Sequence, residues 1–247
     1  MLRALGDGLF GEQYGSGAAQ VLALPGWMRP RADFREVLDG LDALALDLPG
    51  FGGASPAPAE ATGAAGYAAL VAPALDACAP RVIVLGHSYG GRVAVNLAVT
   101  RHERVAALVL TGVPRLLAPE PGPQPSARYR LVRWLHRRGL VSDERMEALR
   151  RRRGSDDYRN ATGVMRDVLV IAVNEHYESV LPRVTCPTEL VWGDDDTAAP
   201  LPMAEAAVSR FGAEATLTIV PGAGHLTPLT AAPALRAALD RHANRTS

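Results

Sequence analysis

Short apolar runs recur along the chain, and each ends in residues that favour a turn. They read QVLALPG (20–26), ALALDLPG (43–50), RVIVLGH (81–87), RVAALVLTG (104–112), TELVWG (188–193) and ATLTIVPG (215–222). Because the runs are continuous rather than alternating, they are typical of strands buried on both faces of a parallel sheet. Most are separated by alanine-rich segments with helical spacing, at 64–79, 90–101, 202–211 and 229–243. This alternation predicts an α/β fold with a doubly wound, mostly parallel sheet.

The alternation is interrupted between Pro114 and Pro187, where a proline-rich stretch precedes about 60 residues of helical, arginine-rich sequence. We therefore expect a core of residues 1–114 and 184–247 with a helical lid inserted at 115–183. The lid segment has 14 arginines and 9 acidic residues, a net charge of +5, whereas the rest has 12 and 17, a net charge of −5.

Composition excludes several classes of protein. All 26 basic residues are arginine, so chemistry that needs a lysine, such as a Schiff base or a P-loop, is absent. The formal charge of zero gives no general attraction to nucleic acid or to an anionic membrane. The two cysteines, Cys78 and Cys186, lack the spacing of a zinc site. We expect a cytoplasmic protein, monomeric or homodimeric, that acts on a small molecule and needs no cofactor or metal ion.

The sequence RVIVLGHSYGGRVAV places a G-x-S-x-G pattern between a predicted strand and a predicted helix. Small residues on either side allow a sharp turn that exposes the hydroxyl of Ser88, and the helix N-terminus favours developing negative charge. A serine hydroxyl needs a base near neutral pH. His225, in the glycine-flanked loop GAGH after the last apolar run, is the best candidate among six histidines. The other five are expected to be packed or solvated.

By these motifs the chain resembles the α/β-hydrolase superfamily over nearly its whole length. The matching pieces are LPGW, DLPGFGGAS, GHSYGG, WGDDDTAAP and GAGH, in the superfamily's order of serine, acid and histidine. The resemblance implies that Asp196 is the acid, because Trp192, Gly193, Asp196 and Pro200 fit the pattern W-G-x-x-D-x-x-x-P. Asp194 and Asp195 are then turn residues that bond to their own local backbone, rather than parts of a metal site.

The resemblance also assigns the oxyanion hole to the backbone N–H groups of Trp27 and Tyr89. The chain departs from the common pattern at Pro25, where a histidine is usual, so the loop is expected to be stiffened by proline instead. In the lid, apolar residues at helical spacing suggest that Trp134 and Met165 roof an acyl pocket with arginines at its mouth. The alternative is that these apolar residues only pack the lid against the core, while the arginines face water.

The expected function is that of a serine hydrolase, a carboxylesterase for small to medium apolar acyl esters. Other chemistries of the same residue set remain open: a thioesterase, a lactonase, a carbon–carbon bond hydrolase, a perhydrolase or a lyase. A non-catalytic ligand-binding member of the fold is the alternative from another class. In the epoxide hydrolases and haloalkane dehalogenases of this superfamily, the nucleophile at the position of Ser88 is an aspartate. The serine therefore argues against both activities.

Overall fold

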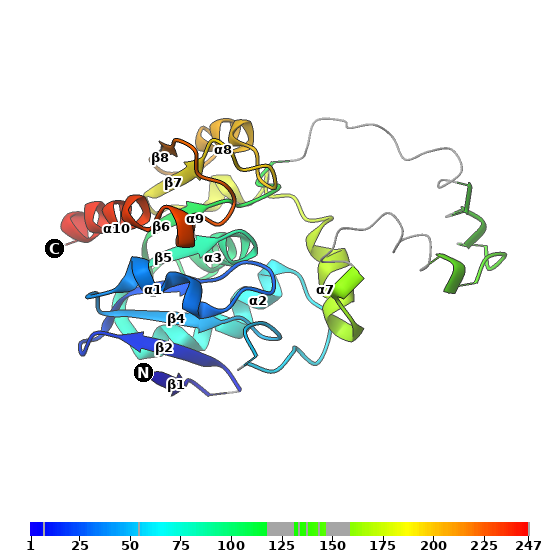
Figure 1. Cartoon of the computed structure of the whole chain (residues 1–247), viewed down its shortest axis with the longest axis horizontal. Coiled ribbons are helices and arrows are strands. Elements are labelled where there is room, and N and C mark those ends of the chain that lie inside the picture. Colours follow the sequence, from blue (N-terminus) through cyan, green and yellow to red (C-terminus); the bar gives the residue numbers. More distant parts are fainter. Residues whose placement is uncertain are drawn as a thin grey trace.

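The computed structural model describes residues 1–6, 8–53, 55–117, 131–132, 134–136, 138–142, 144–146 and 159–246. These residues form an eight-stranded sheet covered by helices on both faces (Figure 1). The predicted α/β fold with a mostly parallel sheet is therefore confirmed. No helix in the described part of the chain is long and apolar enough to cross a membrane.

The strand order across the sheet is β1-β2-β4-β3-β5-β6-β7-β8. The six predicted runs form the parallel part, which consists of β3 (Ala19–Leu24), β4 (Ala43–Asp47), β5 (Cys78–His87), β6 (Val105–Thr111), β7 (Thr188–Gly193) and β8 (Ala215–Val220). Because these strands are parallel, their carboxyl ends meet at one edge of the sheet. The loops that follow β3, β5, β7 and β8 carry the candidate site residues to that edge.

Two antiparallel strands, β1 (Leu2–Ala4) and β2 (Phe10–Tyr14), extend the sheet at the end that carries the N-terminus (Figure 1). The sequence patterns do not predict them. Both are short, β1 is exposed, and β2 contains a glycine, so neither forms the continuous apolar run of a buried strand. A Cβ at Gly11 would lie 2.8 Å from a methyl carbon of Leu44, which explains why β2 carries a glycine where it pairs with β4.

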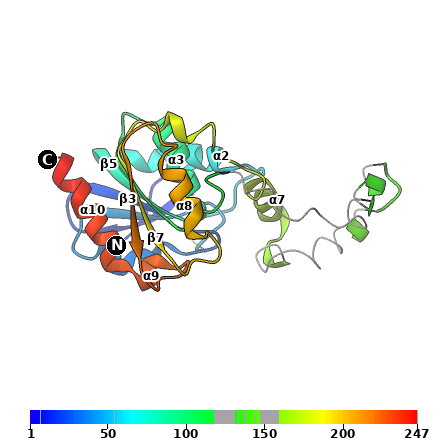
Figure 2. The ribbon, with the colours of Figure 1, turned by 90° about the horizontal axis from the view of Figure 1, so that it is seen from above.

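Side chains that alternate along each strand divide between two apolar layers. Leu22 and Leu24 face the layer with α2 (Ala64–Val71), α3 (Tyr89–Thr100) and α8 (Leu201–Val208). Val21 and Ala23 face the layer with α1 (Arg35–Leu38) and α10 (Ala232–Thr246). Figures 1 and 2 show α10 and α3 on opposite sides of the sheet. This burial on both faces accounts for the continuous apolar character of the central strands.

The predicted helix over 64–79 is wrong in its second half. Its first part is α2, but residues 72–77 form a 3-10 helix, and Cys78 and Ala79 already belong to β5. Pro73 explains the change, because a proline has no N–H for the α-helical ladder and its ring clashes with the preceding turn. The 3-10 helix connects the end of α2 directly to the start of β5.

Within the predicted lid segment, the structure describes α7 (Gly163–Ala172) and a 3-10 helix at Leu181–Arg183. Most of 118–158 lies outside the described residues, so the division into core and lid stays a prediction. The described helix α7 lies beside α2 (Figures 1 and 2). Polar contacts attach this region to the core: for example, Arg92 donates to the carbonyl of Ala172, and Glu175 accepts from the N–H of Ala64 at the start of α2.

The closest backbone approach between β5 and α3 occurs at a pair of glycines. A Cβ at Gly86 would lie 2.5 Å from the Cα of Gly91 and 2.9 Å from its backbone nitrogen. Such a separation is impossible without movement of the backbone. The first turn of α3 can therefore lie against the end of β5 only because Gly86 lacks a side chain, whereas a Cβ at Gly91 would lie 2.2 Å from Val113 Cγ2.

We predict that Gly86→Ala lowers the free energy of unfolding by about 2 kcal/mol or more, because the new methyl group overlaps backbone atoms that cannot rotate away. Urea unfolding followed by circular dichroism measures the change. Gly224→Ala is the control, since a Cβ added there would meet no atom within 4 Å and the φ of Gly224 is not positive. Equal stability of the two variants would contradict the tight β5–α3 approach.

Candidate active site

Ser88 lies in the sharp turn between β5 and α3, with φ 52° and ψ −117°. This left-handed conformation is strained for a residue with a side chain, and such strain is often found at functional sites. The N–H of Ser88 donates to the carbonyl of Thr111 on β6 at 2.9 Å, and its carbonyl accepts from Gly91 at 3.0 Å. The turn is thus held from both sides, and its side chain faces the carboxyl edge of the sheet.

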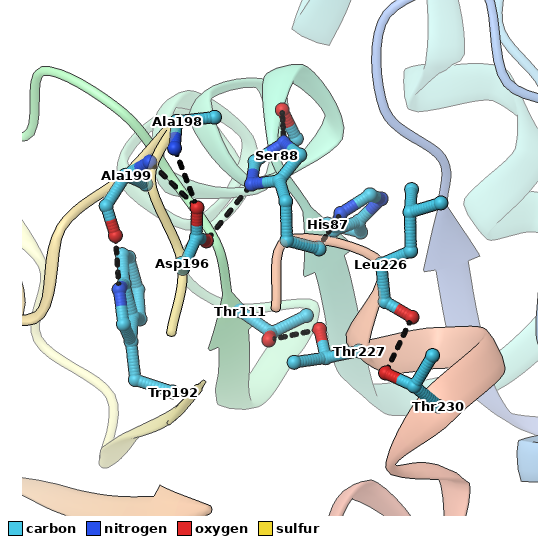
Figure 3. A network of polar contacts seen from close by, with 11 residues as sticks. His87, Ser88, Thr111, Trp192, Asp196, Ala198, Ala199, Leu226, Thr227 and Thr230 are labelled. Carbon is cyan, nitrogen blue, oxygen red and sulfur yellow. Dashed lines mark hydrogen bonds and ion pairs between the residues drawn. The ribbon is translucent and has the colours of Figure 1, made fainter. Parts of the chain in front are cut away.

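Asp196 follows β7 in a loop that also orients its carboxylate (Figure 3). One carboxylate oxygen, Oδ1, accepts from the N–H groups of Ala198 and Ala199, both at 2.8 Å. The indole of Trp192 fastens the loop by donating to the carbonyl of Ala199 at 2.6 Å. The second oxygen, Oδ2, remains for His225.

His225 lies between the aspartate and the serine. Its Nδ1 is 2.8 Å from Asp196 Oδ2, and its Nε2 is 3.1 Å from Ser88 Oγ. Gly112, at φ 56°, packs closely against His225 and Asp196. A Cβ at this position would lie 3.1 Å from His225 Nδ1 and 3.2 Å from Asp196 Oδ2, so a larger residue would crowd both side chains. A chain of hydroxyl, imidazole and carboxylate can move a proton from serine to histidine while the aspartate fixes the tautomer.

The environment of Asp196 keeps its carboxyl group ionised. Burial alone raises its pKa, since the side chain is almost inaccessible. The hydrogen bonds from His225 and from the Ala199 and Ala198 amides outweigh that effect, so the pKa lies below the usual aspartate value. An ionised carboxylate is what stabilises a histidine that gains a proton.

The two neighbouring aspartates have different surroundings. Both are exposed, and neither contacts His225. Asp194 accepts a hydrogen bond from the N–H of Gly222 at 2.7 Å, and the N–H of Asp195 donates to the carbonyl of Ala223 at 3.1 Å. Both are turn residues, as predicted, but the carboxylate of Asp194 bonds to Gly222 rather than to its own local backbone. Both residues thus tie the loop that carries Asp196 to the loop that carries His225. Among the described residues, no cluster of three potential metal ligands occurs.

The predicted oxyanion donors lie next to Ser88. Tyr89 is the first residue of α3, where a backbone N–H has no acceptor within the helix. The N–H of Trp27 donates to no atom in the described part of the chain. The loop between β3 and Trp27 packs tightly against the turn, since a Cβ at Gly26 would lie 3.2 Å from Ser88 Cβ and one at Gly90 only 2.4 Å from the carbonyl oxygen of Pro25.

A cavity of about 200 Å³ opens beside Ser88 and His225. Its other walls come from both sides of the sheet edge and from α7: Trp27, Tyr89, Arg92, Pro114, Arg115, Leu169, Ala172, Val173 and Ala198. The two residues expected to roof an acyl pocket lie elsewhere. Met165 approaches Gly50 and the hydroxyl of Tyr67, and Trp134 is 46% exposed with the guanidinium of Arg138 4.0 Å from its ring. The predicted helical spacing is present in α7, but the helix turns Leu169, Ala172 and Val173 toward the cavity instead of Met165.

The family model for the alpha/beta hydrolase family matches residues 21–239. The chain belongs to this family. A curated relative from Pseudomonas sp, named 2-hydroxy-6-oxononadienedioate/2-hydroxy-6-oxononatrienedioate hydrolase, is 26% identical over 194 residues. That alignment covers 71% of this chain and 68% of the relative. The chain is thus an alpha/beta hydrolase with a hydrolase among its sequence relatives.

Solved structures with the same fold have different named activities. Bromoperoxidase from Bacillus anthracis is 18% identical, with a TM-score of 0.72, and 99% of each chain is covered. A thermophilic esterase from Thermogutta terrifontis is 21% identical, with a TM-score of 0.64, covering 95% of this alpha/beta hydrolase and 94% of the esterase. These likenesses establish the fold, but they do not establish which reaction the enzyme performs.

His87, for which the sequence predicts ordinary packing or solvation, belongs to the support of the site. It is 1% exposed, and its Nε2 lies 2.9 Å from the carbonyl oxygen of His225. Because a carbonyl only accepts, Nε2 must carry the proton. Burial, with a smaller effect from His225, lowers the pKa of His87 to about 4, so the ring is neutral near pH 7. In the sequence, only the position of His87 directly before Ser88 could have indicated that it supports the site.

The lowered pKa of His87 predicts how the free energy of unfolding changes with pH. Its pKa is about 4 in the folded protein and about 6.5 when unfolded, so the unfolded chain binds the extra proton between these values. Stability from this residue is therefore complete above pH 6.5 and is lost as the pH falls toward 4. We expect wild type to lose about 2 kcal/mol more than His87→Gln between pH 7 and pH 5.

Chemical unfolding of both proteins at the two pH values measures that difference. His102→Gln is the matched control, because it makes the same substitution at a side chain that is 68% exposed. The assignment of a neutral, buried His87 would be wrong if His87→Gln kept the wild-type loss of stability in acid.

Proposed function

We propose that the protein is a serine hydrolase whose preferred substrates are carboxylic esters with a small to medium acyl group. The observation that carries this proposal is the continuous contact from Ser88 Oγ through His225 to Asp196, with distances of 3.1 and 2.8 Å. Family membership over residues 21–239 supports it, since the fold is one that presents a nucleophile on such a turn.

The reaction follows from the chemistry of these groups. Ser88 Oγ forms a bond to the substrate carbonyl carbon while His225 Nε2 accepts the hydroxyl proton. The N–H groups of Trp27 and Tyr89 stabilise the oxyanion. The carbon–oxygen bond to the alcohol then breaks, and the protonated His225 gives its proton to the departing oxygen. Water repeats the sequence on the acyl-enzyme and releases the acid.

The cavity supports a limit on the size of the acyl group. Its volume of about 200 Å³ is at the small end for ligand sites, and Leu169, Ala172 and Val173 contribute apolar surface beside Ser88. A short to medium acyl chain therefore fits the volume, whereas long acyl chains would have to leave the cavity through its opening.

A carbon–carbon bond hydrolase is the second candidate, and the 26% identical relative from Pseudomonas is the observation that favours it. That chemistry uses the same serine and histidine but breaks a carbon–carbon bond beside a ketone, so a carbanionic leaving group must be stabilised and protonated. Parallel assays of methyl esters from two to eight acyl carbons and of a 2-hydroxy-6-oxodienoate separate the two candidates. Turnover of the dienoate alone would overturn the esterase proposal.

We predict that an organophosphonate labels Ser88 and no other residue, and that Ser88→Ala stays folded without ester turnover. The reason is that only a serine with an adjacent base is a strong nucleophile. Peptide mass spectrometry locates the adduct, and kinetics should show a loss on the order of 10⁴-fold or more in kcat. Ser55→Ala is a control for general loss of a buried serine. An adduct that persists in Ser88→Ala would exclude Ser88 as the nucleophile.

Among the consecutive aspartates, only Asp196 should matter strongly for catalysis. Asp196→Asn leaves an amide that cannot stabilise a protonated His225, so we expect kcat to fall on the order of 10⁴-fold. Asp194→Asn keeps an oxygen that can accept from Gly222, and it should stay within about threefold of wild type because the acid loop is retained. Steady-state assays of both variants test the assignment, and a larger loss in Asp194→Asn would show the acid to be misassigned.

A further inference from the structure

Arg92 is a buried cation at the candidate active site that the proposed mechanism does not use. It is 5% exposed, lies on α3 and lines the cavity together with Ser88. Ser88 is the residue directly before α3, and Arg92 lies in the first turn of that helix. A helical side chain also leans toward the N-terminus of its helix, which here is the end that carries Ser88.

The hydrogen bonds of Arg92 do not neutralise its charge. Its Nε donates to the carbonyl of Pro114 at 3.0 Å, and its Nη1 donates to the carbonyl of Ala172 at 2.5 Å. Both acceptors are neutral. Within the described residues, no carboxylate lies at ion-pair distance, and Nη2 makes no hydrogen bond. Because an arginine keeps its proton, the structure holds a positive charge that faces the cavity without a counter-ion.

The groups around Arg92 do not supply that counter-ion either. Burial lowers the pKa of its guanidinium, and Tyr177 and Glu175 act in the opposite direction from a longer range. Glu175 lies outside ion-pair distance of Arg92 and is oriented by other groups: Oε1 accepts from the N–H of Ala64, and Oε2 accepts from the hydroxyl of Tyr177 at 3.0 Å. Burial also raises the pKa of Tyr89 and of Tyr177, so both phenols are neutral near pH 7.

A second arginine, Arg115, reinforces the positive charge at the cavity. It lines the same cavity, and it too has no hydrogen bond or ion pair among the described residues. Its φ is 61°, and the other non-glycine residues with positive φ in the described chain are Ser88 and Met28, the neighbour of Trp27. Strain that recurs at a site is a reason to suspect function, since packing alone would favour relaxed backbone there.

We propose that Arg92 binds a carboxylate group of the substrate, so that the preferred substrates are esters that also bear a carboxylate within reach of the same cavity. The positive charge of Arg115, which lines the same cavity, strengthens the binding of that carboxylate. The bound carboxylate would supply the counter-ion that Arg92 lacks and would hold the scissile carbonyl over Ser88. This inference rests on the proposed serine hydrolase function and names its substrate class.

The test compares monomethyl glutarate with methyl pentanoate, which have similar shape but differ in charge, by methanol release from wild type, Arg92→Gln and Arg101→Gln. We expect wild type to favour the glutarate ester in kcat/KM by about 10-fold to 100-fold, the worth of one or two charge-assisted hydrogen bonds. Arg92→Gln should bring the ratio of the two values close to one. Arg101 is exposed at the end of the same helix, and Arg101→Gln should keep the wild-type ratio.

Two results would overturn the proposal. Equal or better hydrolysis of methyl pentanoate by wild type does so without any variant, even if Arg92→Gln fails to fold. A folded Arg92→Gln that loses both activities in the same proportion would show that Arg92 only fastens α3 to the Pro114 and Ala172 carbonyls.

Calorimetric binding of glutarate and pentanoate separates this inference from the proposed function. If Ser88 resists the phosphonate and no ester is hydrolysed, the proposed function fails, but tighter binding of glutarate to wild type than to Arg92→Gln would still support the carboxylate site. If Ser88 is labelled while glutarate binds no better than pentanoate, the carboxylate site fails and the hydrolase proposal stands.

Discussion

The strained backbone of Ser88 is the constraint on which the rest of the site depends. A turn with φ 52° brings the first turn of α3 against the end of β5, and this contact is possible because Gly86 has no side chain. The same turn starts α3, whose first turn carries Arg92. The conformation of this one turn therefore sets the directions of the Ser88 hydroxyl, the Tyr89 N–H and the Arg92 side chain. Packing in the surrounding structure must offset the free energy that the strained backbone costs.

The two loops that complete the site are tied to each other and to the turn. Asp194 and Asp195 bond to the backbone before His225, and Thr111 Oγ1 lies 2.5 Å from Thr227 Oγ1 behind it (Figure 3). His87 adds a bond to the carbonyl of His225 from the turn itself. Three loops from distant parts of the sequence thus share hydrogen bonds, which is how side chains are held at the distances that proton transfer needs.

The sequence predicted the sheet, and motifs predicted which side chains meet. Ser88, Asp196 and His225 were recognisable because each lies at a fixed place after a buried strand, in an order typical of the fold. The antiparallel strands β1 and β2 were missed because short, partly exposed strands carry no continuous apolar run. The cavity walls were not predictable, since Met165 and Leu169 lie on one helix and only the packed structure determines which of them faces Ser88. Arg92 was hidden for a similar reason, because its sequence position gives no indication of burial without a counter-ion.

We propose that the turn at Ser88 and the loop at Trp27 together form an oxyanion site beside the Ser88 hydroxyl. A crystal structure of the protein after reaction with a methyl phosphonate ester tests it most directly, because the adduct resembles the tetrahedral intermediate. We predict phosphorus bonded to Ser88 Oγ, with one phosphonyl oxygen accepting hydrogen bonds from the backbone N–H groups of Trp27 and Tyr89 at about 2.7–3.1 Å. A phosphonyl oxygen that points into solvent, or that is bound by neither N–H group, would show that Trp27 and Tyr89 do not form an oxyanion site.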